Sequence, residues 1–417
     1  MNRTMELSFH GDIVTLRLRY CKSSNFWNHM KDTRFNRSQT IAAYPLAVQE
    51  PGLTLIFGHC RKVFNLLLGI NNYRWQLVAQ GKASWKDFDE LDDELTKIKS
   101  LPEYAYLYEA PAQTLQQEVK HLKRAISGAI KHTARAPNFK RKDAYRQSFT
   151  VTNQEGAIVY RGSKAYFKCP KLKKLCGNEL IRLAEKPRFD CKIMSYTVIK
   201  EGDDWRVVIH FDFAADPRKC QHPDSVCGVD VGIKNPAVCS DGTVLELPDT
   251  SKEEAKIRYY QSKMDRSRHV NGRNRPVSKR FKKFQKKRRA IEKRITNKRK
   301  DAIHKFTHTV TNSHGTVVVE TLDITRMMRS LPGRGARRAC KRAMLGEILR
   351  QLKYKALHCV EAAWNYPSSQ ICSRCGHRHK MPLDQRTYVC PHCGLVIDRD
   401  LNAAINLANY ISQPGQG

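Results

Sequence analysis

Residues 226–247, "VCGVDVGIKNPAVCSDGTVLEL", predict a strand, a second strand, a tight turn at "SDG" and a third strand. Asp230 lies inside the first of these strands, between Val229 and Val231. A carboxylate is costly to bury in an apolar strand unless a positive charge meets it, and a metal ion would supply that charge. Taken alone, Asp230 could also be a surface aspartate on the solvent face of an edge strand.

A second carboxylate ends an apolar strand further along the chain. In "GTVVVETLDI" (315–324), the three valines 317–319 are typical of a central, fully buried strand, and Glu320 follows them. Acidic side chains at strand ends in α/β sheets face the functional edge of the sheet. Asp323 is a weaker candidate because it lies beyond the strand, where we expect the next loop to begin.

The third carboxylate begins a predicted helix in "DRDLNAAINLANY" (398–410), where Asp400 lies in the first turn. Either Asp398 or Asp400 could simply cap this helix, because the helix dipole favours an acid at that end. However, a strand-borne Asp, a strand-borne Glu and a helix-borne Asp in one α/β segment form the set expected of an RNase H-like (RuvC) core. Such carboxylates can hold two Mg²⁺ ions that act on a phosphodiester. The candidate catalytic and magnesium-binding residues are therefore Asp230, Glu320 and Asp400.

Four cysteines near the carboxyl end have the spacing of a metal site. They follow the pattern C-x2-C, fourteen residues, C-x2-C, and each pair precedes a glycine. This spacing predicts a tetrahedral thiolate site for structural Zn²⁺ at Cys372, Cys375, Cys390 and Cys393; the alternative is four unligated cysteines. A zinc ribbon over 367–396, inserted just before the last helix, would fix how Asp400 enters the site. The ten other cysteines are scattered singly, which favours a reducing compartment.

The charge of the chain indicates a polyanionic partner. Lys and Arg number 75 against 40 Asp and Glu, a formal net charge of +35, which favours nucleic acid. Residues 251–300 contribute 21 Lys and Arg and only 4 Asp and Glu, and they predict two helices joined at "NGRNRP" (271–276). A charge run is often just a solvated face, but this density favours phosphate contacts. The candidate nucleic-acid-binding residues are Lys282, Lys283, Lys286, Lys287, Arg288 and Arg289, with Lys140, Arg141 and Lys142 in a second cluster.

The predicted fold class is α/β plus β. Residues 1–222 read as a β-barrel-like platform with an inserted helical bundle, because helical patterns at 51–75 and 110–132 interrupt strand patterns at 6–20 and 147–213. A two-stranded hairpin is expected at "EGDD" (201–204). Residues 223–366 are expected to form the RNase H-like (RuvC) core, including a basic helical hairpin at 251–313. The zinc ribbon (367–396) and the last core helix with its tail (397–417) complete the chain.

Five segments carry a resemblance to a known family: "GVDVGIKNPAV", "VVVETLDI", "PSSQICSRCGHRH", "VCPHCG" and "DRDLNAAINL". They resemble the TnpB (OrfB) proteins of bacterial and archaeal insertion sequences, relatives of the compact type V CRISPR effector nucleases. The resemblance covers roughly the last two thirds of the chain. It implies an Mg²⁺-dependent, RNA-guided DNA endonuclease, in which a guide RNA pairs with double-stranded target DNA. A single RuvC-like site would cut both strands in turn, while the amino-terminal half would grip guide RNA and duplex.

Two other classes of function stay open. One is an RNA-guided DNA-binding regulator that does not cut, and the other is a transposase that performs DNA strand transfer without RNA. No stretch approaches the roughly 20 uninterrupted apolar residues of a membrane-spanning helix, and the amino terminus "MNRTMELSFHGD" lacks the apolar core of a signal peptide. We therefore expect a protein without a membrane partner that acts in the prokaryotic cytoplasm.

Overall fold

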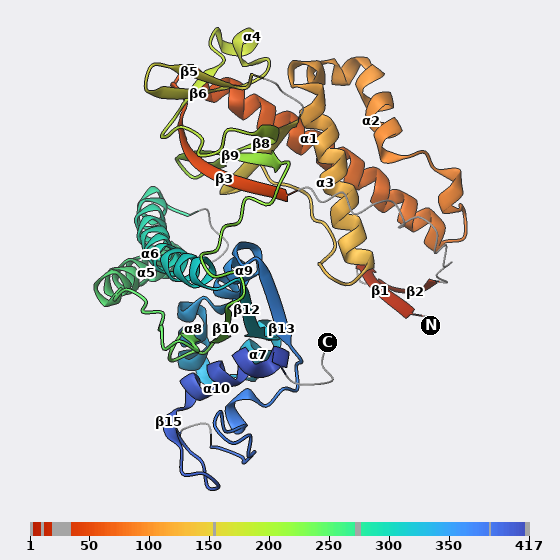
Figure 1. Cartoon of the computed structure of the whole chain (residues 1–417). Helices are drawn as coiled ribbons and strands as arrows, with labels where there is room; N and C mark the ends of the chain where they lie inside the picture. The colour runs from red at the N-terminus through yellow and green to blue at the C-terminus, as the bar shows by residue number, and fades with distance from the viewer. Residues whose placement is uncertain are drawn as a thin grey trace. The chain divides into compact units, whose positions relative to one another are not determined.

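The computed structural model describes residues 3–9, 12–18, 35–152, 156–271, 277–382 and 385–412. The chain divides into two compact units, Met1–Pro217 and Arg218–Gly417, and each unit is described by itself (Figure 1). This boundary lies near residue 222, where sequence patterns change from strands to the segment that carries Asp230.

A seven-stranded antiparallel sheet forms the centre of the first unit. Its strand order is β4-β8-β9-β3-β7-β6-β5, so β4 and β5 are its edges, and its hydrogen bonding is that of an open sheet rather than a closed barrel. The predicted hairpin at "EGDD" is confirmed, because β8 pairs with β9 up to Glu201 and Asp204, and Gly202 takes a φ of +64° in the turn. The strands are β3 (Phe35–Tyr44), β4 (Arg146–Thr152), β5 (Ile158–Arg161), β6 (Lys164–Lys168), β7 (Leu180–Leu183), β8 (Lys192–Glu201) and β9 (Asp204–Phe213).

Three helices are inserted between β3 and β4: α1 (Glu50–Ala79), α2 (Leu91–Ser100) and α3 (Ala112–Ile130). The sequence predictions for 51–75 and 110–132 are confirmed as α1 and α3. Helix α1 begins with Pro51 in its first turn and buries Leu53, Ile56 and Val63 in the core of the unit. In the described part of the chain, α1 is the one helix whose length and composition would allow it to cross a membrane, and half of its apolar 18-residue window is buried.

The first unit also contains shorter elements. A separate antiparallel pair, β1 (Arg3–Phe9) and β2 (Asp12–Leu18), lies where the sequence predicted one strand over 6–20. Apolar and polar residues alternate through both strands, so the period of two does not reveal the break. Short helical segments occur at Trp85–Asp87, Pro102–Glu109 and, as α4, at Leu172–Cys176.

The second unit is built on a four-stranded sheet of order β11-β10-β12-β13. Its strands are β10 (Val226–Asp230), β11 (Val238–Cys239), β12 (Thr316–Glu320) and β13 (His358–Ala362). Strands β10, β12 and β13 are parallel to one another, whereas β11 is antiparallel to β10. The carboxyl ends of the three parallel strands therefore meet at one edge of the sheet.

Helices cover both faces of this sheet. On one face, Val229 and Val317 share a core with Ile303 and Ile348 of helices α6 and α9. On the other face, α10 approaches β10 so closely that a Cβ added at Gly228 would lie 2.0 Å from the carbonyl oxygen of Ala404. The helices are α5 (Ser251–Asn271), α6 (Lys279–Ser313), α7 (Ile324–Ser330), α8 (Gly333–Ala343), α9 (Leu345–Lys355) and α10 (Arg399–Ala408).

Two predicted insertions are present in the second unit. Helices α5 and α6 pack together as the predicted basic hairpin, although most of the expected joint at 271–276 lies outside the described residues. The expected ribbon region contains the segment Ser368–Gln370 and an antiparallel pair, β14 (Thr387–Val389) and β15 (Val396–Asp398). A last short helical segment, Asn409–Ser412, follows α10.

Candidate metal centres and nucleic-acid interface

Asp230 and Glu320 occupy equivalent positions on adjacent parallel strands. Val229 pairs with Val319, and Asp230 and Glu320 are the next residues on their strands. Their backbones therefore lie about 4.8 Å apart, the usual spacing of neighbouring strands. Two residues earlier on the same strands, Gly228 and Val318 contact helix α10. Because side chains alternate across a sheet with a period of two, both carboxylates lie on the side that α10 covers.

Asp400 comes from the first turn of α10, at the same edge. One of its carboxylate oxygens accepts a hydrogen bond of 2.8 Å from the side-chain amide of Asn235, and Arg386 lies 3.7 Å from the other oxygen. Asp398 has a different role, because its carboxylate accepts hydrogen bonds from the backbone N–H groups of Asp400 (2.9 Å) and Leu401 (3.0 Å). The helix cap that the sequence could assign to either aspartate is therefore Asp398.

The three carboxylates interact electrostatically. Burial, together with the neighbouring charges of Glu320 and Asp400, raises the pKa of Asp230 to about 8, against the opposing effect of Arg399. Within the described ranges, only the four cysteines bring three or more possible ligand atoms within 4.8 Å of one another, so the carboxylates are less tightly clustered. A set of carboxylate oxygens suits Mg²⁺, which prefers oxygen ligands. Asp323, the weaker candidate, caps α7 by accepting a hydrogen bond of 2.9 Å from the backbone N–H of Arg326.

Ser368 contacts the acidic edge, and the sequence analysis missed it. Its side chain is 2% exposed, and its hydroxyl donates a hydrogen bond to a carboxylate oxygen of Glu320. Its carbonyl oxygen accepts a hydrogen bond of 2.8 Å from the side-chain amide of Asn406, on α10. Ser368 therefore joins the acid on β12 to the helix that carries Asp400.

Two asparagines on α10 hold the start of the ribbon region. Asn402 accepts a hydrogen bond of 3.0 Å from the backbone N–H of Ser373 and donates one of 2.7 Å to the carbonyl of Ile371. Asn406 donates a second hydrogen bond of 2.7 Å to the same carbonyl. Both side chains are buried. Their spacing of four residues in an otherwise apolar helix is the signal that could have revealed this contact, because buried amides need partners.

The four predicted zinc ligands come together. The Sγ atoms of Cys372 and Cys393 lie 3.5 Å apart, and those of Cys375 and Cys390 lie 3.6 Å apart. Four thiolates around one Zn²⁺, each at a Zn–S distance of about 2.3 Å, would lie about 3.8 Å from one another. The cluster thus has the donor set and spacing of a structural zinc site.

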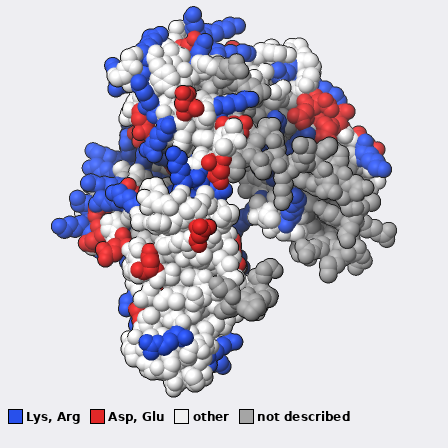
Figure 2. All heavy atoms as spheres, viewed as in Figure 1, with Lys and Arg blue, Asp and Glu red and all other residues white. Residues whose placement is uncertain are grey.

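Helix α6 carries most of the predicted nucleic-acid-binding residues, and Lys and Arg gather over α5 and α6 in Figure 2. The side chains of Lys282, Lys283, Lys286 and Lys287 are exposed. Arg288 and Arg289 are half-buried; Arg288 lies 3.2 Å from Glu292 and donates a hydrogen bond to Gln261 of α5. The four lysines therefore form the surface most open to phosphate contacts.

The second basic cluster is partly neutralised within the first unit. Lys140 pairs with the buried carboxylate of Glu118, and its ammonium lies 4.1 Å from the centre of the Phe64 ring. Arg141 makes two hydrogen bonds to Asp143, of 3.1 and 2.9 Å. Lys142 is exposed. Lys140 thus has a structural role that counting charges along the sequence cannot show.

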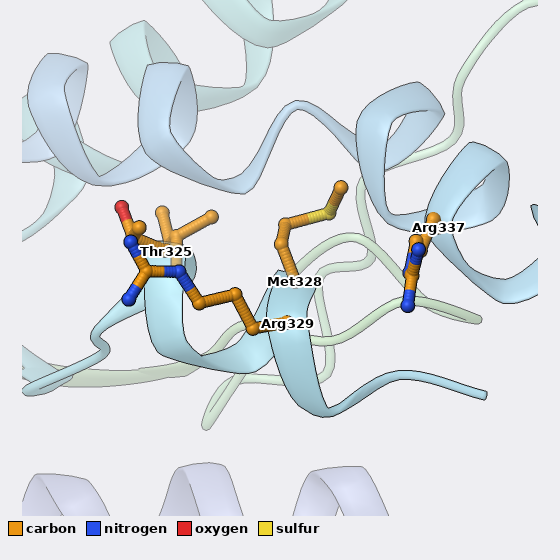
Figure 3. Close-up of a pocket in the computed structure, with 5 residues that line it drawn as sticks. Thr325, Met328, Arg329 and Arg337 are labelled. Carbon is orange, nitrogen blue, oxygen red and sulfur yellow. The ribbon is translucent and has the colours of Figure 1, made fainter. Parts of the chain in front are cut away.

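A pocket of about 490 Å³ lies between helices α7 and α8, the two helices that follow Glu320 in the chain (Figure 3). Ile324, Thr325 and Met328 line it, together with Arg329 and Arg337. Both arginines are exposed, and neither has an acidic partner within the part of the chain that the structure describes. The pocket adds positive charge beside the strand that carries Glu320.

Two family models match the chain, almost entirely within the second unit. Residues 210–331 match the OrfB_IS605 family, described as "Probable transposase", and residues 346–407 match the "Cas12f1-like, TNB domain". The fold is similar to a solved structure, "Cryo-EM structure of the Cas12f1-sgRNA-target DNA complex", with a TM-score of 0.57 and 14% identity over 90% of this chain and 99% of that one.

Similar proteins occur in several bacteria. "Putative RNA-guided DNA endonuclease InsQ" of Escherichia coli (strain K12) is 28% identical over 389 residues, 87% of this chain and 89% of that protein. "Putative RNA-guided DNA endonuclease" of Streptomyces pristinaespiralis is 28% identical, and the aligned region covers 87% of this chain and 86% of that protein. "Putative RNA-guided DNA endonuclease Rv2885c" of Mycobacterium tuberculosis (strain ATCC 25618 / H37Rv) is 31% identical over 68% of this chain and 63% of its own length. By these family matches and relatives, the chain is similar to proteins of the TnpB (OrfB) family.

Proposed function

We propose that this chain is an RNA-guided DNA endonuclease encoded by a transposable element. A bound guide RNA would pair with one strand of double-stranded target DNA, and the protein would hydrolyse the DNA in a single RuvC-like site. The names of the similar proteins support the activity, and the solved structure of similar fold was determined with guide RNA and target DNA. Since its partners are nucleic acids, we place its action in the prokaryotic cytoplasm, at the nucleoid.

The observation that carries the proposal is the placement of three carboxylates at one edge of the parallel sheet. Asp230 and Glu320 lie side by side on β10 and β12, and Asp400 comes from the helix that covers them. These residues would hold two Mg²⁺ ions, which supply an activated water and charge stabilisation for the leaving oxygen. Ser368 would orient Glu320, and Asn235 would orient Asp400, because each donates a hydrogen bond to that carboxylate.

The remaining parts would bind and position nucleic acid. The exposed lysines of α6 would contact phosphates, an interaction that depends on salt rather than on base sequence. The zinc ribbon would keep α10 in place, because Asn402 and Asn406 bond to the backbone just before and within its first cysteine pair. The first unit would grip guide RNA and target duplex.

The test is to purify the protein from cells that carry its native locus and to sequence any RNA that copurifies. The complex is then given Mg²⁺ and DNA that matches the guide, with unmatched DNA and RNase-treated complex as controls. We expect cleavage of matched DNA only, and loss of cleavage after RNase treatment.

Two other outcomes would favour other functions. RNA-dependent binding without cleavage would favour a DNA-binding regulator, although the complete acidic set speaks against it. Joining of DNA ends without RNA would favour a transposase, the function in the description of the OrfB_IS605 family.

A further inference from the structure

Trp364 is the most exposed large apolar side chain in the described part of the chain, at 82% exposure. It lies two residues beyond Ala362, which ends β13 and pairs with Glu320. Tryptophan is usually buried or in contact with a ligand or partner, since its large ring gains much from leaving water. An exposed indole beside the acidic edge therefore calls for a binding partner.

The turn that carries Trp364 is tied to the end of the chain's last helical region. The backbone N–H of Tyr366 donates to the carbonyl of Ala363 (2.9 Å), and the N–H of Ala363 donates to the hydroxyl of Tyr410 (3.1 Å). The rings of Tyr366 and Tyr410 pack edge to face at 4.9 Å, and the Tyr366 hydroxyl donates to the carbonyl of Asn406 (3.0 Å). The turn is therefore well anchored, and it holds Trp364 in an exposed position.

Chain geometry places the backbone of Trp364 near Glu320. Paired residues on neighbouring strands lie about 4.8 Å apart, and two further residues span at most about 7.6 Å, so the Cα atoms of Trp364 and Glu320 lie within about 12 Å. Ser368, four residues after Trp364, donates a hydrogen bond from its hydroxyl to the carboxylate of Glu320. A group held on the indole would therefore be next to a phosphate held at the carboxylates.

We propose that Trp364 is a stacking platform for one base of the single-stranded nucleic acid whose phosphate lies at Asp230, Glu320 and Asp400. This inference rests on the proposed nuclease function. Stacking on an aromatic side chain accepts any base, which suits an enzyme whose sequence choice comes from a guide. Arg386, 3.7 Å from Asp400, adds a positive charge at the same edge for the phosphate backbone.

The surroundings of Trp364 favour a base over a protein surface. Its neighbours Ala363 and Asn365 are exposed and small or polar, and Glu361 is exposed and pairs with Lys353. A protein interface needs a continuous apolar patch, whereas a single indole matches the face of one base. Bases inside a duplex are already stacked on each other, so the platform selects an unpaired strand.

The direct test uses a short single-stranded DNA that contains 2-aminopurine and does not match the guide, with EDTA present to prevent cleavage. Stacking on the indole quenches 2-aminopurine fluorescence. We expect the wild-type protein–RNA complex to quench the fluorescence, and the Trp364→Tyr complex to quench it as well. The affinity of the Trp364→Ala complex for this DNA should be weaker by roughly 5- to 100-fold. Tyr354→Ala is the matched control, because this exposed aromatic lies just before β13, at the opposite edge of the sheet, and should not matter.

A second test uses cleavage of matched DNA in Mg²⁺. An abasic site next to the cut position should slow the wild-type protein but should slow Trp364→Ala no further, because the stacking contact is already lost. The proposal would be overturned if the Trp364→Ala complex quenched 2-aminopurine fluorescence as much as the wild-type complex does. It would also be overturned if the wild-type complex did not quench the fluorescence. Equal slowing of both proteins by the abasic site would also overturn it. If the 2-aminopurine results hold while no variant cuts, the stacking platform stands and the nuclease function fails.

Discussion

The side chain of Asp398 accepts a hydrogen bond of 2.9 Å from the backbone N–H of Asp400. This contact gives the two aspartates different roles at the start of α10, because Asp398 satisfies the helix end and Asp400 is free to interact with Asn235 and Asp230. The two residues can therefore be told apart by mutation.

The first prediction concerns the acidic set. Asp230→Ala, Glu320→Ala and Asp400→Ala should each abolish Mg²⁺-dependent cleavage of matched DNA, because each removes a ligand for ions that are needed only for hydrolysis. The affinity of the protein–RNA complex for target DNA should stay nearly unchanged, as measured by filter binding or mobility shift in EDTA.

Asp398→Ala is the control for these variants. It should retain cleavage and lower the free energy of unfolding by about 1 kcal/mol, the usual cost of losing an N-cap, and Asp398→Asn should restore most of that loss. Loss of cleavage in Asp398→Ala with cleavage retained in Asp400→Ala would move the third ligand by two residues. Cleavage by all four alanine variants would refute the nuclease site.

The second prediction concerns Ser368. Removing its hydroxyl in Ser368→Ala leaves Glu320 without its hydrogen-bond donor, so the cleavage rate should fall about tenfold and the Mg²⁺ concentration for half-maximal rate should rise. Ser373→Ala is the matched control, because the contact of Ser373 with Asn402 uses its backbone N–H. An unchanged Mg²⁺ dependence in Ser368→Ala would show that the hydrogen bond does not position the metal-binding carboxylate.

The third prediction concerns divalent cations and stability. Three neighbouring carboxylates repel one another when no cation is bound, so Mg²⁺ should raise the melting temperature of the second unit, by about 2–4 °C for each kcal/mol of binding energy. Asp230→Asn removes one of the repelling charges when the proteins are compared above about pH 8, where Asp230 is ionised in the wild type. This variant should melt higher than the wild type in EDTA and should respond little to Mg²⁺ in differential scanning fluorimetry, and an equal response in both proteins would argue against a cation site at Asp230.

The fourth prediction concerns zinc. Cys390→Ser should reduce bound zinc, measured by atomic absorption, and should lower solubility and melting temperature, because the ribbon region has only a small apolar core without its metal. Cys220→Ser changes a half-buried cysteine outside the cluster and should keep one zinc per chain. A Cys390→Ser protein with wild-type zinc content and melting would contradict the four-thiolate site.

The fifth prediction concerns the lysines of α6. Changing Lys282, Lys283, Lys286 and Lys287 to Gln should weaken nucleic-acid binding and flatten its dependence on salt, by about 0.9 in the logarithmic slope for each lost phosphate contact. Lys305→Gln, on the same helix but paired with Asp301 at 2.9 Å, should leave the slope unchanged. If the fourfold variant had the same salt dependence as the wild type, these lysines would only be solvated and would not contact phosphates.

The sequence by itself determined the local elements and the chemistry of their ends. Apolar runs with a period of 3.6 predicted α1 and α3, and an all-apolar run before Glu320 predicted a central strand. The doubled C-x2-C pattern predicted four cysteines that the structure does bring together, because short knuckles hold each pair at metal-binding distance whatever the rest of the chain does. The helices, the strand and each cysteine knuckle depend on neighbours within a few residues, whereas the two knuckles meet across 15 to 21 positions of the chain.

Only the tertiary structure decided the contacts between distant residues. The parallel register of β10 and β12 sets Asp230 beside Glu320, and the capping geometry separates Asp398 from Asp400. Ser368 reaches Glu320 across 48 positions of the chain, and Lys140 is neutralised by a buried Glu118. Composition and periodicity carry no information on such pairs, because the partner of a polar group is chosen by how whole elements pack and by the cost of leaving that group buried without one.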